Sequence, residues 1–218
     1  GVELSAGYDN QWRDFRWATN FTYSWNRNEI IELAANAVNP VTGEPLNLNK
    51  LDIKGLGKAK YILKEGGTLG DLYTTSDLRF NDNGYIEVDK NGNLLLTDEG
   101  DDIYLGSVFP DHNLAWRNDF SWKGINLGVL FTARIGGICY SATQANMDLY
   151  GVSEASAAAR DAGGVWINGR ELVDAQKWYQ AIGSQSGLPQ YYTYSATNIR
   201  LQELSLGYTC LLYTSDAA

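Results

Sequence analysis

The chain contains one histidine, His112, and it stands beside Asp111. A Ser-His-Asp hydrolase would also need a serine on a sharp turn, and the Gly-X-Ser-X-Gly pattern of such a turn does not occur. Asp101 and Asp102 are adjacent, and neighbours on an extended chain point apart, so they would not form an acid–base pair. We recognise no metal-ligand cluster and no phosphate-binding glycine loop. We therefore expect a protein that is not an enzyme, with His112 in a loop at the mouth of a strand.

Negative charge is concentrated in one segment, and the formal net charge is −9. Between Lys64 and Asp102 there are ten Asp or Glu and three Lys or Arg. An acidic chain repels phosphate backbones, so we exclude nucleic acid as a partner. The run from Asp89 to Asn93 has part of a calcium-loop pattern but lacks the full spacing and the closing glutamate. We expect a solvated loop without metal or cofactor, and divalent-ion binding is the alternative.

Aromatic side chains are the best candidates for ligand contact. The chain has 7 Trp and 14 Tyr. Amphipathic rings suit the faces of sugars and the side chains of peptides. The candidate substrate contacts are Trp166, Trp178, Tyr179, Tyr191 and Tyr192. The alternative is that these rings pack their own segment together or pack against another protein.

The elements that would position these residues begin with an alternating segment. Residues 15–25 alternate between aromatic or apolar and small polar side chains. Successive strand side chains point to opposite faces, so one face is aromatic and the other hydrophilic. The run has 11 residues, and a tilted strand needs ~9–11 to cross a bilayer. Trp17 and Trp25 lie near its ends, where membrane barrels carry aromatic girdles. We predict a transmembrane β-strand over 15–27.

The same alternation predicts four further strands, at 2–8, 113–122, 125–135 and 197–209. A turn is expected at 9–14, and Lys123-Gly124 should make the two-residue turn of a β-hairpin. Asn118 interrupts one apolar face and Leu130 one polar face. The side chains expected to face lipid are Phe15, Trp17, Phe21, Tyr23, Trp25, Trp116, Phe120, Trp122, Leu127, Val129, Phe131, Leu204, Leu206 and Tyr208.

The connections between these strands alternate in length. Residues 9–14 and 123–124 are short, whereas 28–112 and 136–196 are long. Outer-membrane barrels have short periplasmic turns and long outer loops. All five strands obey this rule, so we expect both long segments outside the cell.

The long segments carry signals of their own. Asn83-Gly84 and Asn91-Gly92 predict a small hairpin. Ser153 should cap a short helix that ends near Arg160 and is stopped by Gly163-Gly164. A second helix is expected to carry on one face Leu172, Ala175, Tyr179 and Ile182.

Several local patterns, taken in this order, resemble one family. They are Lys60–Gly67 with Gly70–Tyr73, Leu105-Gly106 with Phe109-Pro110 before Trp116, Gly151–Ser153, Arg160–Val165, Asn168-Gly169 and Tyr194–Tyr208. Over about residues 2–209 the chain resembles the C-terminal barrel region of SusC/RagA-type TonB-linked outer-membrane transporters. The strongest of these patterns is the last, which reads YSATNIRLQELSLGY.

The resemblance implies an all-β fold, an antiparallel transmembrane β-barrel fragment of about five spanning strands with long extracellular loops. It implies a multi-pass protein of the outer membrane of a Gram-negative bacterium, in contact with outer-membrane lipid. The implied function is TonB-dependent uptake of an oligosaccharide or peptide substrate. The implied partners are a SusD-like surface lipoprotein and TonB, which binds through an N-terminal region absent from this sequence.

The sequence departs from the family at its ends. We expect the plug domain and the final strands to be absent, and residues 210–218 to be an atypical tail, with no role for Cys210. Cys139 and Cys210 make no disulfide framework. An open sheet would leave Trp17, Phe21, Phe120 and Phe131 more exposed than core aromatics. The alternative is a secreted β-rich carbohydrate-binding module or adhesin, in which a second sheet covers this aromatic face.

Overall fold

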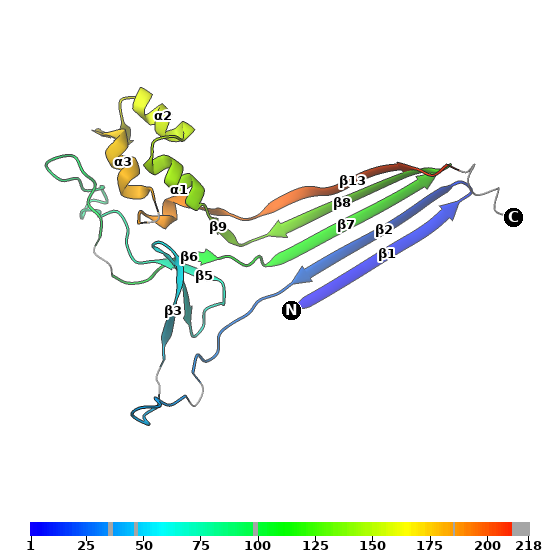
Figure 1. Cartoon of the computed structure of the whole chain (residues 1–218), viewed down its shortest axis with the longest axis horizontal. Coiled ribbons are helices and arrows are strands. Elements are labelled where there is room, and N and C mark those ends of the chain that lie inside the picture. Colours follow the sequence, from blue (N-terminus) through cyan, green and yellow to red (C-terminus); the bar gives the residue numbers. More distant parts are fainter. Residues whose placement is uncertain (35–36, 46–47, 98–99, 185, 211–218) are drawn as a thin grey trace. The chain divides into compact units, whose positions relative to one another are not determined.

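The computed structural model describes residues 1–34, 37–45, 48–97, 100–184 and 186–210. The chain divides into two compact units (Figure 1). The sheet unit contains Gly1–Arg27, Phe109–Gly137 and the described residues from Ala196 onward, and the connection unit contains Asn28–Val108 and Ile138–Ser195. None of the described helices has the length and apolar character needed to cross a membrane. The expected tail at 211–218 lies outside the described residues.

The sheet unit is one antiparallel sheet with the strand order β1-β2-β7-β8-β13. Its strands are β1 (Val2–Trp12), β2 (Phe15–Trp25), β7 (His112–Trp122), β8 (Ile125–Ile135) and β13 (Asn198–Tyr208). The sheet is open, with β1 and β13 at its edges. The predicted all-β antiparallel fold and the pairing of neighbouring strands are therefore confirmed.

The first turn is shorter than the sequence predicted. Trp12 pairs with Phe15, so the turn consists of Arg13 and Asp14 rather than residues 9–14. Asp9 and Gln11 belong to the polar face of β1, whereas Asn10 lies on the apolar face opposite Trp17. Asp9 Oδ1 accepts a hydrogen bond of 3.0 Å from Arg16 Nε on β2. The hairpin turn at Lys123-Gly124 is confirmed, since Trp122 pairs with Ile125.

A β-bulge in β13 shifts its pairing with β8. Leu201 pairs with Phe131, and the next paired residue is Glu203, opposite Leu130. The extra residue at this step is Gln202. Because of it, the apolar side chains of β13 change from odd positions (Ile199, Leu201) to even positions (Leu204 onward) and still lie on one face.

All the long connections leave the sheet at one end. Trp25 pairs with His112, and His112 pairs with Ile135, so β2, β7 and β8 meet there. Gly136 and Gly137 end β8 with φ angles of 84° and 80°, a backbone conformation that glycine adopts without steric cost. We call this the connection end, and we call the end with the two short turns the turn end.

The connection unit contains a four-stranded sheet that the sequence analysis missed. Its strands are β3 (Lys50–Leu56), β4 (Ala59–Lys64), β5 (Asp71–Thr74) and β6 (Ile103–Ser107). Part of the acidic segment, expected to be a solvated loop, therefore belongs to a packed sheet. Asp71 is only 4% exposed, and its carboxylate accepts hydrogen bonds from the backbone N–H and the hydroxyl of Thr68.

Both predicted turns are present, closed by antiparallel bridges between Phe80 and Ile86 and between Val88 and Leu94. The hairpin is part of three short segments that bond in a ring. The N–H of Arg79 donates to the carbonyl of Leu95, that of Leu95 to Glu87, and that of Glu87 to Arg79. Tight turns at Asn81–Tyr85 and Asp89–Asn93 connect the segments. Buried Leu78 and Leu94 join this ring to the main core of the unit.

The described part of this unit contains three α-helices, two of which contribute residues to that core. They are α1 (Ala142–Leu149), α2 (Glu154–Asp161) and α3 (Ala175–Ile182). The cap of α2 is Ser153, as predicted, while α1 was not expected. Leu172 was wrongly assigned to the second helix, because it lies in β11.

The remaining short elements complete the connection unit. They are β9 (Ile138–Tyr140) with β12 (Thr193–Ser195), β10 (Val165–Ile167) with β11 (Glu171–Val173), and the 3₁₀ helix η1 (Pro189–Tyr192).

Candidate functional site

The five strands combine into one apolar face and one polar face. Side chains at directly paired positions lie on the same side of a sheet. One row across its middle consists of Ala6, Phe21, Trp116, Phe131 and Leu201. Phe21 and Phe131 are each 40% exposed, as expected for an uncovered face, whereas Tyr73 in the four-stranded sheet is 2% exposed.

Polar groups on the apolar face bond to one another. The indole N–H of Trp17 donates to Asn118 Oδ1 at 3.1 Å, and that of Trp116 donates to Thr19 Oγ1 at 3.0 Å. Asn118, the interruption noted in the sequence, is 6% exposed. These hydrogen bonds satisfy the two indole N–H groups, which the apolar side chains around them could not do.

His112 lies in β7 itself, so its expected place in a loop is wrong. Its Nδ1 is 2.9 Å from the hydroxyl oxygen of Tyr23, and the two rings stack with centroids 5.8 Å apart. This pairing gives His112 a structural role at the connection end of the sheet.

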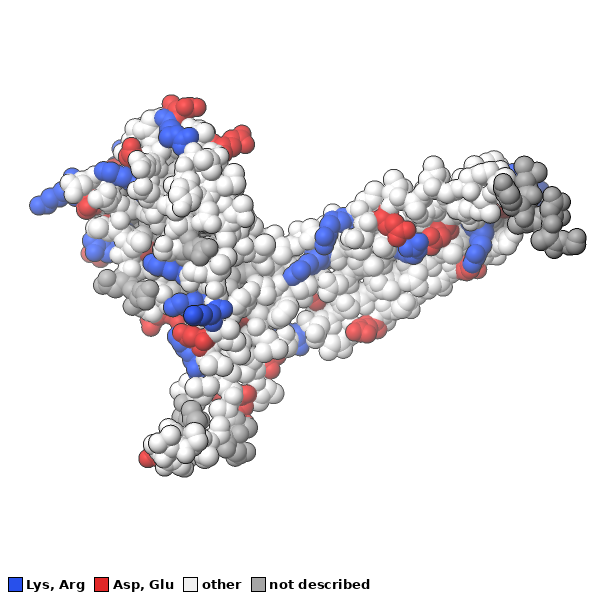
Figure 2. All heavy atoms as spheres, viewed as in Figure 1, with Lys and Arg blue, Asp and Glu red and all other residues white. Residues whose placement is uncertain are grey.

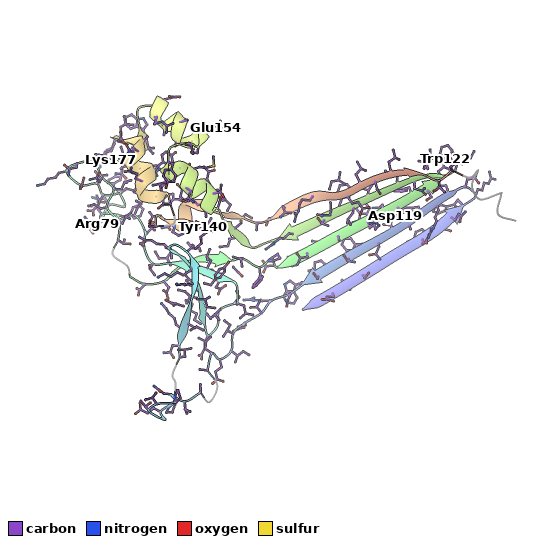
Figure 3. All side chains as sticks on the ribbon, in the orientation of Figure 1. Arg79, Asp119, Trp122, Tyr140, Glu154 and Lys177 are labelled. Atoms are coloured by element: carbon purple, nitrogen blue, oxygen red, sulfur yellow. The ribbon has the colours of Figure 1, made fainter. Side chains whose placement is uncertain are left out.

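The polar face carries ion pairs near the middle of the sheet. Arg117 Nε lies 2.8 Å from Asp119 Oδ2, and its Nη1 lies 3.0 Å from Glu203 Oε2 (Figure 3 labels Asp119). Gly128 leaves room for this group, because a Cβ there would lie 2.5 Å from Ser205 Oγ and 3.2 Å from Asp119 Oδ1. Figure 2 shows charged side chains of both signs on the sheet. These contacts link β7 to β13 and fix the polar face across three strands.

A hollow of about 640 Å³ lies on the sheet at the connection end. Charged residues that line it are Glu3, Arg134 and Arg200. Neutral polar residues from all five strands also line it, namely Ser5, Thr22, Ser24, Asn113, Thr132 and Gln202. The rest of the lining consists of Leu4, Tyr23, Leu114, Ala115 and Ala133. The sequence analysis did not identify this hollow, although the alternation already placed Arg134 on the polar face.

The five aromatic candidates lie in different surroundings. Tyr192 is 2% exposed and belongs to the core, and Trp178 and Tyr179 pack against that core. Trp166 is 65% exposed on β10, and Tyr191 is 37% exposed. Trp178 and Tyr191 meet edge to face, with ring centroids 6.1 Å apart. Of the five candidates, Trp166 and Tyr191 are therefore the two that are exposed to solvent.

Burial changes the ionisation of these tyrosines. Desolvation is the main cause that raises the pKa of Tyr179, Tyr191 and Tyr192 above the ordinary value. The carboxylate of Asp148 adds to the rise for Tyr179 and Tyr192. All three hydroxyls therefore stay neutral at physiological pH and can act as hydrogen-bond groups only.

The calcium-like run closes a turn through its own side chains. Asp89 Oδ1 accepts hydrogen bonds of 2.8 Å from the backbone N–H of Asn91 and of Asn93. The bond from Asn93 is the largest cause of the lowered pKa of Asp89. Across the described part of the chain, no group of three or more His, Cys, Asp and Glu side chains is arranged to hold a metal ion.

Comparison with known proteins gives the chain a context. No family model matches it. Over 215 residues it is 23% identical to TonB-dependent receptor P3 of Formosa agariphila, which covers 90% of this chain and 20% of that protein. TonB-dependent receptor P39 of the same organism is also 23% identical, over 89% of this chain and 22% of its own length. The predicted resemblance to TonB-linked transporters is confirmed.

A solved structure shares the fold of this chain. The chain matches the RagAB peptide importer in its "closed-closed" state with a TM-score of 0.53, at 20% sequence identity. The match covers 94% of this chain and 22% of that one. The chain thus spans about a fifth of the length of the proteins that it matches. By their names, these proteins are two receptors and a peptide importer.

Proposed function

We propose that this chain forms part of the wall of a TonB-dependent transporter that imports glycan fragments or peptides across the outer membrane of a Gram-negative bacterium. The observation that carries the proposal is the two-faced sheet of 11-residue strands. Strands of this length suit a bilayer, and alternation between an apolar outer face and a polar inner face is the pattern of a membrane barrel.

The apolar face supports contact with lipid rather than with a second protein layer. It contains exposed Trp116 and Trp122 and the two 40% exposed phenylalanines. A continuous aromatic patch of this kind favours association or aggregation in water, but acyl chains cover it without loss of hydrogen bonds. In this proposal the lipid-facing set is the one predicted from the sequence, together with Ile199 and Leu201 on the first half of β13.

The polar face would then line the transport path, and the connection unit would lie on the outer side of the membrane. Of the five candidate aromatic residues, Trp166 and Tyr191 are the best placed to contact substrate, since both are exposed. A SusD-like surface lipoprotein and TonB are the proposed partners of the full-length protein. The names of the relatives support the dependence on TonB and the import of a substrate.

The proposal is tested on the full-length protein in its native cell. We expect it in the outer-membrane fraction, extracted only by detergent, with gel migration that changes on heating. Uptake of its substrate should stop in a strain without TonB and persist in the parent strain. Recovery of the protein from the culture medium as a detergent-independent species would favour the secreted binding module instead.

Substrate class is tested by competition. Neutral oligosaccharides and short peptides are offered to the parent strain and to a strain that lacks the transporter. Saturable uptake of one class that requires both the transporter and TonB would identify the cargo. Unchanged uptake of both classes in the deletion strain would contradict an import function.

A further inference from the structure

A small cavity lies among the three helices of the connection unit, where α3 contacts both α1 and α2 (Figure 1). Its volume is about 170 Å³. A water molecule occupies about 30 Å³ in the liquid, so the cavity has room for a charged group and the atoms next to it. Asp148, Ser156 and Ala175 are buried residues of the lining, whereas Tyr150, Arg160 and Gln176 are exposed. The cavity therefore has a floor inside the unit and a mouth at its surface.

The floor of this cavity carries a carboxylate whose neighbours are neutral. Asp148 is 5% exposed. Its Oδ1 accepts a hydrogen bond of 2.9 Å from Gln144 Nε2, and the buried hydroxyl of Tyr192 lies near it. In the described part of the chain, no Lys, Arg or His nitrogen forms an ion pair with Asp148. A buried charge is costly without an opposite charge, so a ligand that brings a cation would be stabilised here.

The other groups around the carboxylate suit a hydrogen-bond donor. The hydroxyl of Ser156 donates to the carbonyl oxygen of Ser153 at 2.9 Å, so its oxygen can only accept a bond from a ligand. The ring of Tyr179 also lines the cavity, and Asp148 is the second cause, after burial, of the raised pKa of its hydroxyl. A primary ammonium group has three N–H donors and binds well beside an aromatic ring. A calcium ion would require about six to eight oxygen ligands, more than Asp148 and Ser156 can provide.

Arg160 provides a hydrogen-bond donor at the mouth. Its Nη1 donates a bond of 2.7 Å to the carbonyl oxygen of Gly151, which holds the guanidinium group beside the cavity. Gly151 has a φ of 68°, and a Cβ there would lie 2.7 Å from Nη1, so glycine leaves room for this arrangement. The other N–H groups of Arg160 can donate to an oxygen atom of a ligand. The cavity is thus suited to a ligand with an ammonium group and an oxygen on the next carbon.

We propose that this cavity binds a primary ammonium group of the imported oligomer, with Asp148 as the counter-charge and Arg160 as the donor to the neighbouring oxygen. This inference rests on the proposed transport function and defines the chemistry of its cargo. The N-terminal residue of a peptide and an amino sugar both carry an ammonium group with an oxygen on the next carbon.

The test uses the full-length transporter, in the complex in which it is isolated, and two matched pairs of probes. One pair is a short lysine-free peptide with a free N-terminus and its N-acetylated form. The other is a disaccharide of glucosamine and its N-acetylated form. The variant is Asp148→Asn, which removes the charge and keeps an acceptor for Gln144. The control is Asp161→Asn, which neutralises an exposed acid at the end of α2, outside the cavity lining.

A second variant leaves the buried carboxylate in place. Gln176→Trp puts a large ring at the mouth, and the backbone N–H of residue 176 keeps its capping bond to Asp174. Because the substitution is on the surface, this variant separates loss of the site from misfolding of the unit.

We expect wild type to bind one free-amine probe more tightly than its acetylated form. Asp148→Asn should weaken that binding about tenfold or more and leave binding of the acetylated form unchanged. Gln176→Trp should weaken it about fivefold or more. Asp161→Asn should change neither by more than about twofold. The pair of probes that responds identifies the source of the ammonium group.

Three results would overturn the inference: no preference of wild type for a free amine, equal binding of the amine by wild type and Asp148→Asn, or equal loss for free and acetylated probes. If Asp148→Asn does not fold, unchanged amine binding by Gln176→Trp would overturn it as well. The transport proposal fails separately. Energy-coupled uptake of the acetylated probes without any preference for amines would remove the inference and leave transport in place. Amine binding that depends on Asp148, without TonB-dependent uptake, would do the reverse.

Discussion

Asn118 and Trp17 illustrate how a polar residue is accommodated on an apolar surface. Asn118→Leu would leave the indole N–H of Trp17 without its 3.1 Å acceptor, and an unsatisfied donor of this kind costs about 1–3 kcal/mol. We predict that Trp17→Phe and Asn118→Leu are coupled, so that the double variant loses less stability than the sum of the two single losses. The measurement is the free energy of unfolding of the full-length protein in lipid vesicles. Additive losses would show that the bond contributes nothing.

Tyr192 makes the stability of the connection unit sensitive to alkali. Burial raises the pKa of its hydroxyl in the folded state, while the unfolded tyrosine ionises near pH 10. A group with a raised folded pKa contributes stability that is full below its unfolded pKa and lost as pH rises. We predict that the unfolding temperature falls above about pH 10, and that Tyr192→Phe reduces this fall.

A surface tyrosine provides the control for that titration. Tyr150 is 77% exposed, so Tyr150→Phe should leave the alkaline fall unchanged. Tyr140, Tyr179 and Tyr191 also have raised pKa values caused first by burial. The fall should therefore shrink, not vanish, in Tyr192→Phe. An identical fall in Tyr192→Phe and in wild type would contradict the prediction.

At the scale of the strand, side-chain orientation can be tested in matched pairs. Phe21 and Phe131 lie at the same level of the sheet, both paired with Trp116, near the middle of their strands. Arginine at either position should cost roughly 2–4 kcal/mol of barrel stability if that level is the bilayer midplane. Asn20→Arg and Thr132→Arg, on the polar face, should cost much less. Equal losses on both faces in a folding titration would refute the lipid-facing assignment.

The strands that the sequence predicted share one property: a regular alternation long enough to be recognised. The five long strands have it, whereas the helix after Ser153 was predicted from its cap residue and its glycine stop. The four-stranded sheet was missed because its strands are short: β3 alternates over only seven residues, all of them exposed, and β5 has only four residues. Asp71 looks like a solvated acid in the sequence, and its burial is explained by the hydrogen bonds that its carboxylate accepts from Thr68 and Tyr104.

The candidate site was predictable only in part for a related reason. Alternation assigns each residue to a face, and it placed Arg134 on the polar one. Whether Arg134 and Arg200 line one hollow depends on the register between β8 and β13, which the bulge determines. The aromatic character of a residue likewise does not predict that Tyr192 is buried and Trp166 exposed. Contacts between segments that are distant in the sequence determine both the lining of the hollow and the burial of these rings.

At the scale of the whole protein, the proposed topology predicts which sites reagents reach from outside the cell. Both native cysteines are free and exposed, so they are first replaced by serine. Val41→Cys, at a position 90% exposed in the connection unit, should then react with a membrane-impermeant maleimide on intact cells. Lys123→Cys, in the short turn, should react only after permeabilisation. The opposite pattern would invert the topology.

The extra residue in β13 allows that strand to change its length by one residue without changing which side chains lie on each face of the sheet. Without Gln202, the segment would read Leu201, Glu203, Leu204, Ser205, Leu206, an unbroken in-and-out sequence with the same partners on β8. Deletion of one residue from a strand ordinarily moves all the following side chains to the opposite face of the sheet. Deletion of Gln202 would instead keep each side chain on its present face and would remove the local bend of the bulge. Related proteins can therefore differ by one residue here and still build the same wall, so an alignment gap at this position would mark a change of curvature and not a break in the fold.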